Sequence, residues 1–269
     1  MARTRVPSTS LLALTLTAGL ALTTTGCGGG SESTSSSTGG EGSAPVVVAT
    51  TTWEGALAKA AGAKDVEVIV PQSVQHAPDY DPRPSDLAAV AGADYVLYAP
   101  FEPYAAKIKE AAGSDAELVE VNLDNDADKA KAEVARLGKL FGTGDAAERW
   151  TTAFDSEYAT LQKGLKGKWP DGKQPTVVAQ VFVTWAAKMA GADVAGSFGP
   201  EAVTARQLSG LSKKKPRLVV DNAHMTTGTV LPDSGAEQVE IVNYPGTDLD
   251  LLAVYRDAAK TLETAMAAS

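Results

Sequence analysis

The stretch VEVIVPQSVQHAPDYDPRPSDLAAVAGADYVLYAP, residues 66–100, contains a β-rich run, a proline-rich loop, a short helical run and a second β-rich run. This order predicts a βαβ unit, in which a helix joins two parallel strands. Similar β-rich runs recur on either side of a long helical segment. The predicted strands are PVVVATTT (45–52), VEVIVP (66–71), DYVLYAP (94–100), ELVEVN (117–122), TVVAQVF (176–182), DVAGSF (193–198), RLVVDN (217–222) and VEIVNYP (239–245). We therefore expect an α/β protein of two lobes, each with a mostly parallel four-stranded sheet flanked by helices.

The segment between the two sets of strands, residues 127–168, has apolar residues at helical spacing and is expected to be a long bridging helix. Its sequence GTGDAA, residues 142–147, predicts either a kink or a helix break, with Asp145 capping the helix that follows. The motif also matches G-x-G-x-x-A. Nucleotide binding by that motif requires a preceding strand, whereas the preceding segment here is helical.

The first 27 residues have a basic start, a short apolar run and then Gly26-Cys27, which predicts an export signal. Cys27 is the only cysteine, so neither a disulfide nor a cysteine-rich zinc site can form within one chain. The sequence LTTTGC is similar to a bacterial lipobox, with Thr24 where leucine is usual. Cys27 is expected to be lipidated, and the alternative is a secreted protein with an incidental cysteine.

Residues 28–44 are rich in glycine, serine and threonine and are expected to be a disordered tether. The predicted organisation is a signal peptide (1–27), a linker (28–44), an N-terminal lobe (45–126), a bridging helix (127–168) and a C-terminal lobe (169–269). Without Arg3 and Arg5 the chain keeps 22 of its 24 basic residues against 33 acidic ones, a net charge of −11. This charge disfavours nucleic acid as a partner.

Ligands of open α/β sheets bind beyond the carboxyl ends of the strands. The side chains that the predicted strands deliver there include both histidines of the chain. The candidates are His76, Glu102, Gln180, Glu201, Asp221, His224 and Asp248.

Imidazole and carboxylate are the donor mixture that zinc prefers and that manganese and iron also use. We expect His76, Glu102 and His224 to bind one divalent ion between the lobes. Gln180, Glu201 and Asp248 are reserve ligands, and Asp221 is a candidate acceptor that orients a ligand histidine. Each histidine alone has the simpler interpretation of a solvated polar residue, and Glu102 that of a helix cap.

The loop that carries His76 also contains Pro78, Pro82 and Pro84, each of which fixes a backbone torsion. A stiff loop loses little entropy when it is held in a single binding geometry, which suits a preformed ligand. Ser85 is expected to cap the helix that follows the loop.

The stretch QHAPDYDPRPSDLAAVAGADYVLY (75–98) resembles the first signature of the metal-binding receptor lipoproteins of ABC-type zinc, manganese or iron importers. FEPY (101–104), FVTWAAKMAG (182–191) and FGPEAVTARQLSGL (198–211) resemble later segments of the same family. The resemblance implies one ion held between two lobes, with His76 as a ligand. It also implies a lipid-anchored monomer outside the cell membrane, with a membrane permease as its partner.

The chain departs from the family pattern at two positions. A second histidine commonly precedes the bridging helix, where this chain has VNLDND (121–126), and zinc-specific members often carry a third where Ala179 and Gln180 stand here. His224, in DNAHMTTG (221–228), resembles a variant branch whose second lobe donates from another strand.

The sequence is therefore interpreted as a non-enzymatic receptor for zinc, manganese or iron. Because the imidazoles bind metal when neutral, capture should release protons and weaken below about pH 6. One alternative is an organic or chelated ligand in a cleft lined by Trp53, Phe101, Tyr104, Trp185 and Tyr244. A metal-dependent hydrolase and a purely adhesive protein are the others; H-E-x-x-H and G-x-S-x-G are both absent from the sequence.

Overall fold

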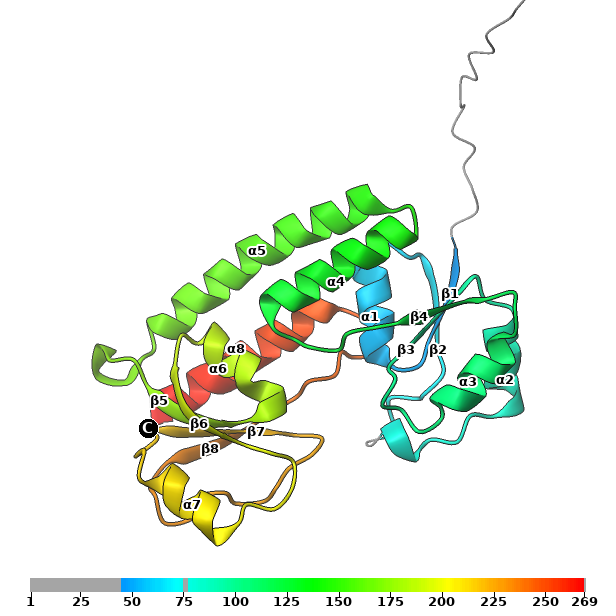
Figure 1. Cartoon of the computed structure of the whole chain (residues 1–269). Helices are drawn as coiled ribbons and strands as arrows, with labels where there is room; N and C mark the ends of the chain where they lie inside the picture. Colours follow the sequence, from blue (N-terminus) through cyan, green and yellow to red (C-terminus); the bar gives the residue numbers. More distant parts are fainter. Residues whose placement is uncertain (1–44, 75–76, 269) are drawn as a thin grey trace, which may run out of the picture. The chain divides into compact units, whose positions relative to one another are not determined.

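The computed structural model describes residues 45–74 and 77–268, which form two α/β lobes (Figure 1). All eight predicted strands are confirmed, four in each lobe. The N-terminal lobe comprises β1 (Val46–Ala49), α1 (Thr52–Ala60), β2 (Asp65–Val68), α2 (Pro84–Ala91), β3 (Tyr95–Tyr98), α3 (Ala105–Ala112) and β4 (Glu117–Glu120). The C-terminal lobe comprises β5 (Thr176–Gln180), α6 (Thr184–Met189), β6 (Asp193–Phe198), α7 (Ala205–Ser212), β7 (Leu218–Asn222), β8 (Glu237–Ile241) and α8 (Leu251–Ala268). Short 3-10 helices span Ala77–Asp79, Pro170–Gly172 and Val181–Val183.

The two sheets have the same topology. Their strand orders are β2-β1-β3-β4 and β6-β5-β7-β8, and every pairing is parallel. Parallel strands end at one edge of a sheet, so the loops that follow them gather at that edge. In the N-terminal sheet, β2 lies on one side of β1, and β3 and β4 follow on the other side, so the strand order reverses between β1 and β3. The same reversal occurs between β5 and β7 in the C-terminal sheet.

Each sheet is buried on both faces. Successive residues of a strand point to opposite faces, so neighbouring residues lie in different cores. Val47 of β1 faces the large core that holds Leu57 of α1, whereas Val48 faces the smaller core beneath α2 and α3. The C-terminal sheet repeats this arrangement, with Val178 and Val219 facing α7. The near-continuous apolar runs of the sequence therefore follow from two-sided burial.

The predicted bridging segment forms two helices that lie side by side, α4 (Ala127–Leu140) and α5 (Gly144–Lys166) (Figure 1). Of the two expected alternatives, a kink or a break, the structure has the break. Gly142 has a φ of +70°, a conformation that ends helices readily at glycine. Asp145 does not cap α5 as predicted, because it lies in the first turn and Thr143 stands at the cap.

The helix after the proline-rich loop also begins differently from the prediction. Its first residue is Pro84 and its cap position is Arg83, so Ser85 lies within the first turn. The carboxylate of Asp86 accepts a hydrogen bond of 2.8 Å from the Arg83 backbone N–H. None of the helices in the described ranges is long and apolar enough to cross a membrane.

Candidate functional site

The side chains that matter follow the strands at the two points where the winding reverses. Thr50 follows β1, Glu102 follows β3, Gln180 ends β5 and His224 follows β7. Open α/β sheets bind their ligands at such points. The topology therefore gives each lobe one ligand-binding edge.

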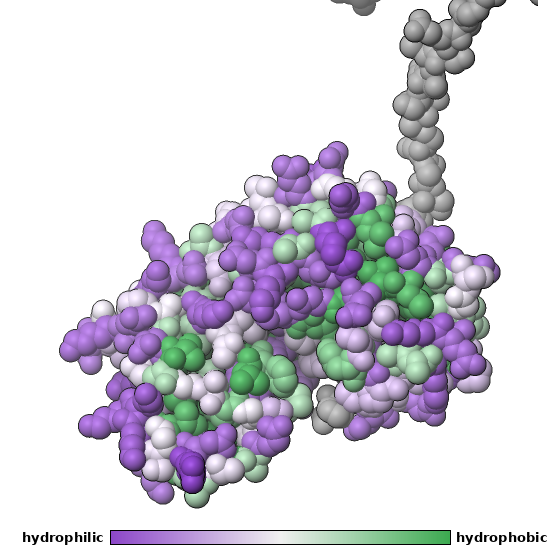
Figure 2. Space-filling model, viewed as in Figure 1, coloured by the Kyte–Doolittle hydropathy of each residue, from purple (hydrophilic) through white to green (hydrophobic). Residues whose placement is uncertain are grey.

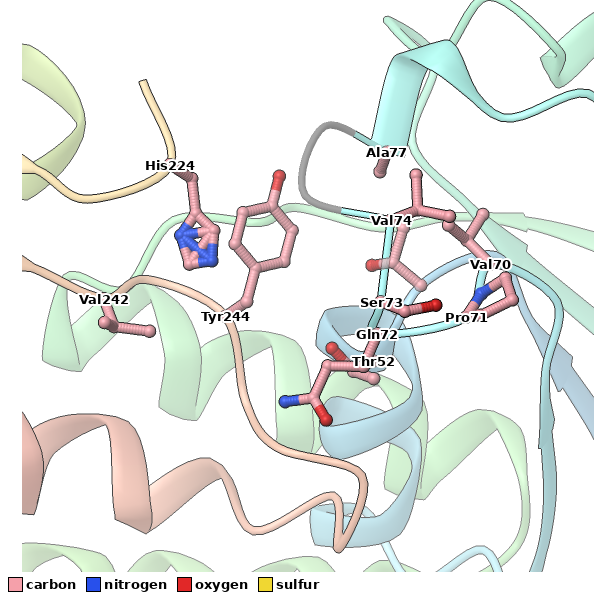
Figure 3. A pocket seen from close by; sticks show the side chains of 11 residues that line it. Thr52, Val70, Pro71, Gln72, Ser73, Val74, Ala77, His224, Val242 and Tyr244 are labelled. Carbon is pink, nitrogen blue, oxygen red and sulfur yellow. The ribbon is translucent and has the colours of Figure 1, made fainter. Parts of the chain in front are cut away.

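A cavity of about 460 Å³ lies where these edges meet. Figure 3 shows His224 and Tyr244 of the C-terminal lobe facing Val74 and Ala77 of the N-terminal lobe across it. The predicted ligand His76 and its neighbour Gln75 lie outside the described residues. Val74 and Ala77, which flank them in the sequence, line the same cavity as His224.

His224 is fixed by its backbone and by its ring. Its N–H donates a 2.9 Å hydrogen bond to Asn222 Oδ1, and its ring centroid lies 4.6 Å from that of Tyr244. Burial lowers the pKa of the imidazole below its usual value, so the ring is neutral at pH 7. Nδ1 is buried and finds no hydrogen-bond partner among the described residues. A neutral imidazole with an unpaired nitrogen is the form that binds metal.

The N-terminal lobe contributes two buried carboxylates. Glu102 Oε2 accepts a 3.1 Å hydrogen bond from the Ala99 N–H, and its Oε1 accepts one of 2.9 Å from the Tyr104 hydroxyl. Glu54 accepts from the Thr51 N–H in a capping box at the start of α1. Its Oε1 is buried, and no described residue provides a partner for it.

The two carboxylates oppose each other's ionisation. Burial raises the pKa of Glu102 to about 8, and the charge of Glu54 contributes to the rise. Burial also raises the pKa of Glu54. A cation beside the pair would relieve both the desolvation and the repulsion, because it stabilises the charged form of each group.

Tyr244 packs on His224, and the charges of the acidic pair act on its phenol. Burial raises the pKa of its phenol to about 12, and the charges of Glu54 and Glu102 add to the rise. The phenol is thus within electrostatic range of both carboxylates, while its ring packs on the imidazole. Tyr244 therefore connects the acidic side of the cleft with the histidine side.

Four buried side-chain atoms have no hydrogen-bond partner in the described part of the chain. They are Thr50 Oγ1, Glu54 Oε1, Gln180 Oε1 and His224 Nδ1. Native proteins leave few such groups unpaired, and each one calls for an explanation such as an ion. All four lie at or just beyond the carboxyl ends of β1, β5 and β7, so they mark the ligand-binding edges of both lobes.

The described residues alone do not complete a metal site. Over residues 45–74 and 77–268, no three histidine, cysteine, aspartate or glutamate side chains are grouped so that they could hold an ion. Glu102 is buried in the N-terminal lobe and does not line the cavity, whereas His224 of the C-terminal lobe is half-buried and lines it. The third predicted ligand, His76, is not described. The predicted set of three thus remains a prediction.

Residues 47–171 match the family model described as ZnuA, the periplasmic component A of the zinc-uptake complex. The expected family resemblance is confirmed. The match to the ZnuA family covers the N-terminal lobe together with α4 and α5. A search of curated proteins gave no match.

Solved structures share the fold of the whole described chain. The laminin-binding protein Lmb of Streptococcus agalactiae, described as a bifunctional protein with adhesin and metal transporting activity, is 16% identical with a TM-score of 0.61, over 82% of this chain and 99% of its own. FpvC of Pseudomonas aeruginosa, solved with Mn²⁺, is 14% identical with a TM-score of 0.61, over 83% and 97%. The Zn(II)-bound ZnuA-like domain of AdcA from Streptococcus pneumoniae is 16% identical with a TM-score of 0.54, over 84% and 100%.

The segment before the bridging helices, residues 121–126, contains a buried asparagine, Asn125. Asn125 Oδ1 accepts a 3.0 Å hydrogen bond from Trp53 Nε1, and its Nδ2 donates one of 3.1 Å to the carbonyl of Asn243. Tyr255 donates from its hydroxyl to the Asn125 carbonyl. Asn125 therefore joins α1 of one lobe to the loop after β8 of the other.

Replacing Asn125 with alanine should lower the free energy of unfolding by about 2 kcal/mol, because two buried groups lose their partner. Denaturant titration followed by circular dichroism measures this loss. The matched control is Asn122→Ala, whose side chain is exposed and whose effect should stay within about 0.5 kcal/mol. Equal effects of the two substitutions would contradict the interlobe role of Asn125.

Asp221 holds the loop that carries His224 rather than the imidazole itself. One carboxylate oxygen accepts from Gln180 Nε2 at 3.2 Å, and the other accepts from the Thr226 hydroxyl and the Thr227 N–H. Gln180 Nε2 also donates a 2.8 Å hydrogen bond to the Met225 carbonyl. These contacts fix the backbone on the C-terminal side of His224.

The other two reserve ligands lie apart from this cavity. Glu201 is exposed after β6, and Asp248 is exposed in the loop before α8. The Asp248 carboxylate accepts from the N–H of Asp250, and its carbonyl accepts from Lys59 Nζ at 2.6 Å. Neither residue lines the cavity beside His224.

Glu54 is the site residue that sequence reasoning missed. The pattern T-x-x-E from Thr51 to Glu54 is visible in the sequence and indicates a capping box. A capping glutamate is ordinarily solvated, whereas Glu54 is completely buried. Applying the strand-end rule to the first strand, as well as to the later ones, would have found it.

Proposed function

We propose that this protein is the extracytoplasmic binding component of an ABC importer and that it captures a divalent ion of zinc, manganese or iron between its lobes. The observation that carries the proposal is the placement of four unpaired buried polar atoms at the ligand-binding edges of the two sheets. Two further findings support it: the fold is shared with Lmb, and residues 47–171 match the ZnuA family model.

The proposed ligands are His224, Glu102 and His76, in keeping with the zinc preference for imidazole and carboxylate. His224 supplies a neutral imidazole and Glu102 a carboxylate that ionises when the cation arrives. Glu54, whose charge acts on Glu102, would supply a second negative charge once it ionises. Gln180 is retained as a reserve ligand because its Oε1 is unpaired; Asp221 positions the loop of His224, and Glu201 and Asp248 are the least supported.

The protein is proposed to act by binding and release, without catalysis. Lipidation of Cys27 would anchor it to the outer face of the cell membrane, where residues 28–44 tether the lobes and a permease receives the ion. The support for this part is the sequence: the export signal, the lipobox-like LTTTGC and the Gly/Ser-rich segment. A monomer suffices, since both lobes come from one chain.

Elemental analysis of protein purified without nickel affinity tests the proposal. We expect one equivalent of a divalent transition metal, and a matching rise in thermal stability when the metal-free protein is titrated. An ion at 100 times its dissociation constant adds about 2.7 kcal/mol to the free energy of unfolding. A protein that is metal-free as purified and whose melting is unchanged across zinc, manganese and iron would overturn the proposal and leave an adhesive role.

A further inference from the structure

A second cavity, of about 330 Å³, lies beside the proposed ion site. Five aromatic side chains line it, contributed by both lobes: Trp53, Phe101, Phe182, Trp185 and Tyr244. Pockets of this size between lobes, with mostly apolar and aromatic walls, are typical of sites for small organic molecules. A bare ion uses none of these rings.

The two cavities share one lining residue, Tyr244. One side of its ring packs on His224, with centroids 4.6 Å apart, and its edge meets Trp53 at 5.2 Å. Tyr244 therefore belongs to both the ion side and the aromatic side of the cleft. An organic group in the second cavity would contact the same tyrosine that packs on His224.

The aromatic cavity has an apolar mouth. Phe101 is 67% exposed, Phe182 is 50% exposed and Met225 is 37% exposed, and all three line the cavity. The face of the molecule drawn in Figure 2 is largely hydrophilic, with separate apolar groups on each lobe. Grouped apolar side chains at a hollow indicate a binding surface.

Several polar groups of this wall already have hydrogen-bond partners. Asn125 and Asn243 bond to each other and to the indoles of Trp53 and Trp185. The carboxylate of Asp124 accepts from Lys129 and from the backbone of Asp126. The cavity thus offers mainly ring faces, which suits a flat aromatic body.

We propose that the protein captures its ion together with a small aromatic chelator, whose ring lies among Trp53, Phe101, Phe182 and Tyr244 while the ion faces His224. This inference rests on the proposed function, because the chelator is held through the metal as well as through the rings. Stacking of the ring on aromatic side chains supplies the additional affinity.

Native mass spectrometry and calorimetry with zinc and 1,10-phenanthroline as the probe test this inference. We expect the zinc-loaded protein to bind one phenanthroline and retain its zinc, whereas the metal-free protein binds the chelator at least about tenfold more weakly. The double variant Phe101→Ala, Phe182→Ala should weaken chelator binding to the zinc-loaded protein about tenfold. Its zinc affinity should stay within about twofold of wild type.

The matched control is Leu208→Ala, which removes a partly exposed apolar side chain on α7, away from the cavity. It should change neither affinity. If zinc binds and phenanthroline merely strips it, or if the double variant binds the chelator as tightly as wild type, this inference is wrong and the ion receptor stands. If zinc itself fails to bind the wild type, the proposed function and this inference fall together.

Discussion

Replacement of His224 with alanine is expected to lower the affinity for Zn²⁺ by about 100-fold or more. Loss of a group that merely supports a metal ligand costs 10- to 100-fold, and a ligand itself should cost at least as much. His224 lines the cavity, its ring is neutral, and its Nδ1 is buried without a hydrogen-bond partner among the described residues. Isothermal titration calorimetry of metal-free protein measures the change.

The control for this experiment is His224→Phe, which keeps an aromatic ring against Tyr244 but supplies no nitrogen. It should retain the thermal stability of the wild type and lose zinc affinity as fully as the alanine variant. If the phenylalanine variant binds zinc as the wild type does, the imidazole is a packing residue and not a ligand.

The second large effect is expected from Glu102→Gln, which keeps the shape of the side chain and removes its charge. Zinc affinity should fall by about 10- to 100-fold. The metal-free protein should at the same time be at least as stable as wild type at pH 8, because the buried repulsion between Glu102 and Glu54 is gone. A purely structural glutamate would instead lose stability and leave zinc affinity unchanged. Glu110→Gln, on the exposed side of α3, is the matched control.

The pH dependence of stability follows from the raised pKa of Glu102. The folded value of about 8 exceeds the ordinary value of 4.5, so the stabilising contribution is complete below about pH 4.5 and is lost as pH rises through 8. Wild-type protein without metal should therefore lose unfolding free energy over this range more steeply than Glu102→Gln. Denaturant titrations at pH 5, 7 and 8.5 compare the two slopes; parallel slopes would contradict the raised pKa.

The eight strands could be predicted because each sheet is buried on both faces, and its strands are therefore runs of apolar residues. Val47 and Val48 lie in cores on opposite sides of β1, so both positions are apolar in the sequence. Helix ends were less predictable. Ser85 and Asp145 are residues that favour caps, but Arg83 and Thr143 occupy those positions, because the packing of each helix decides where its first turn begins.

The candidate site was predictable in part for a similar reason. His224 and Glu102 follow strands, and parallel topology alone brings such residues to one edge. The complete burial of Glu54 depends on how α1 packs between the sheet and α4, which no local pattern records. The capture of Asn125 by Trp53 and Asn243 joins residues 118 positions apart, beyond any local signal.

The most direct test of the ion receptor is anomalous diffraction at the zinc absorption edge from crystals of the zinc-loaded protein. The account predicts one strong peak in the cleft, about 2.0–2.2 Å from a ring nitrogen of His224 and from a carboxylate oxygen of Glu102. A peak bound elsewhere, with His224 and Glu102 both out of its coordination sphere, would contradict it.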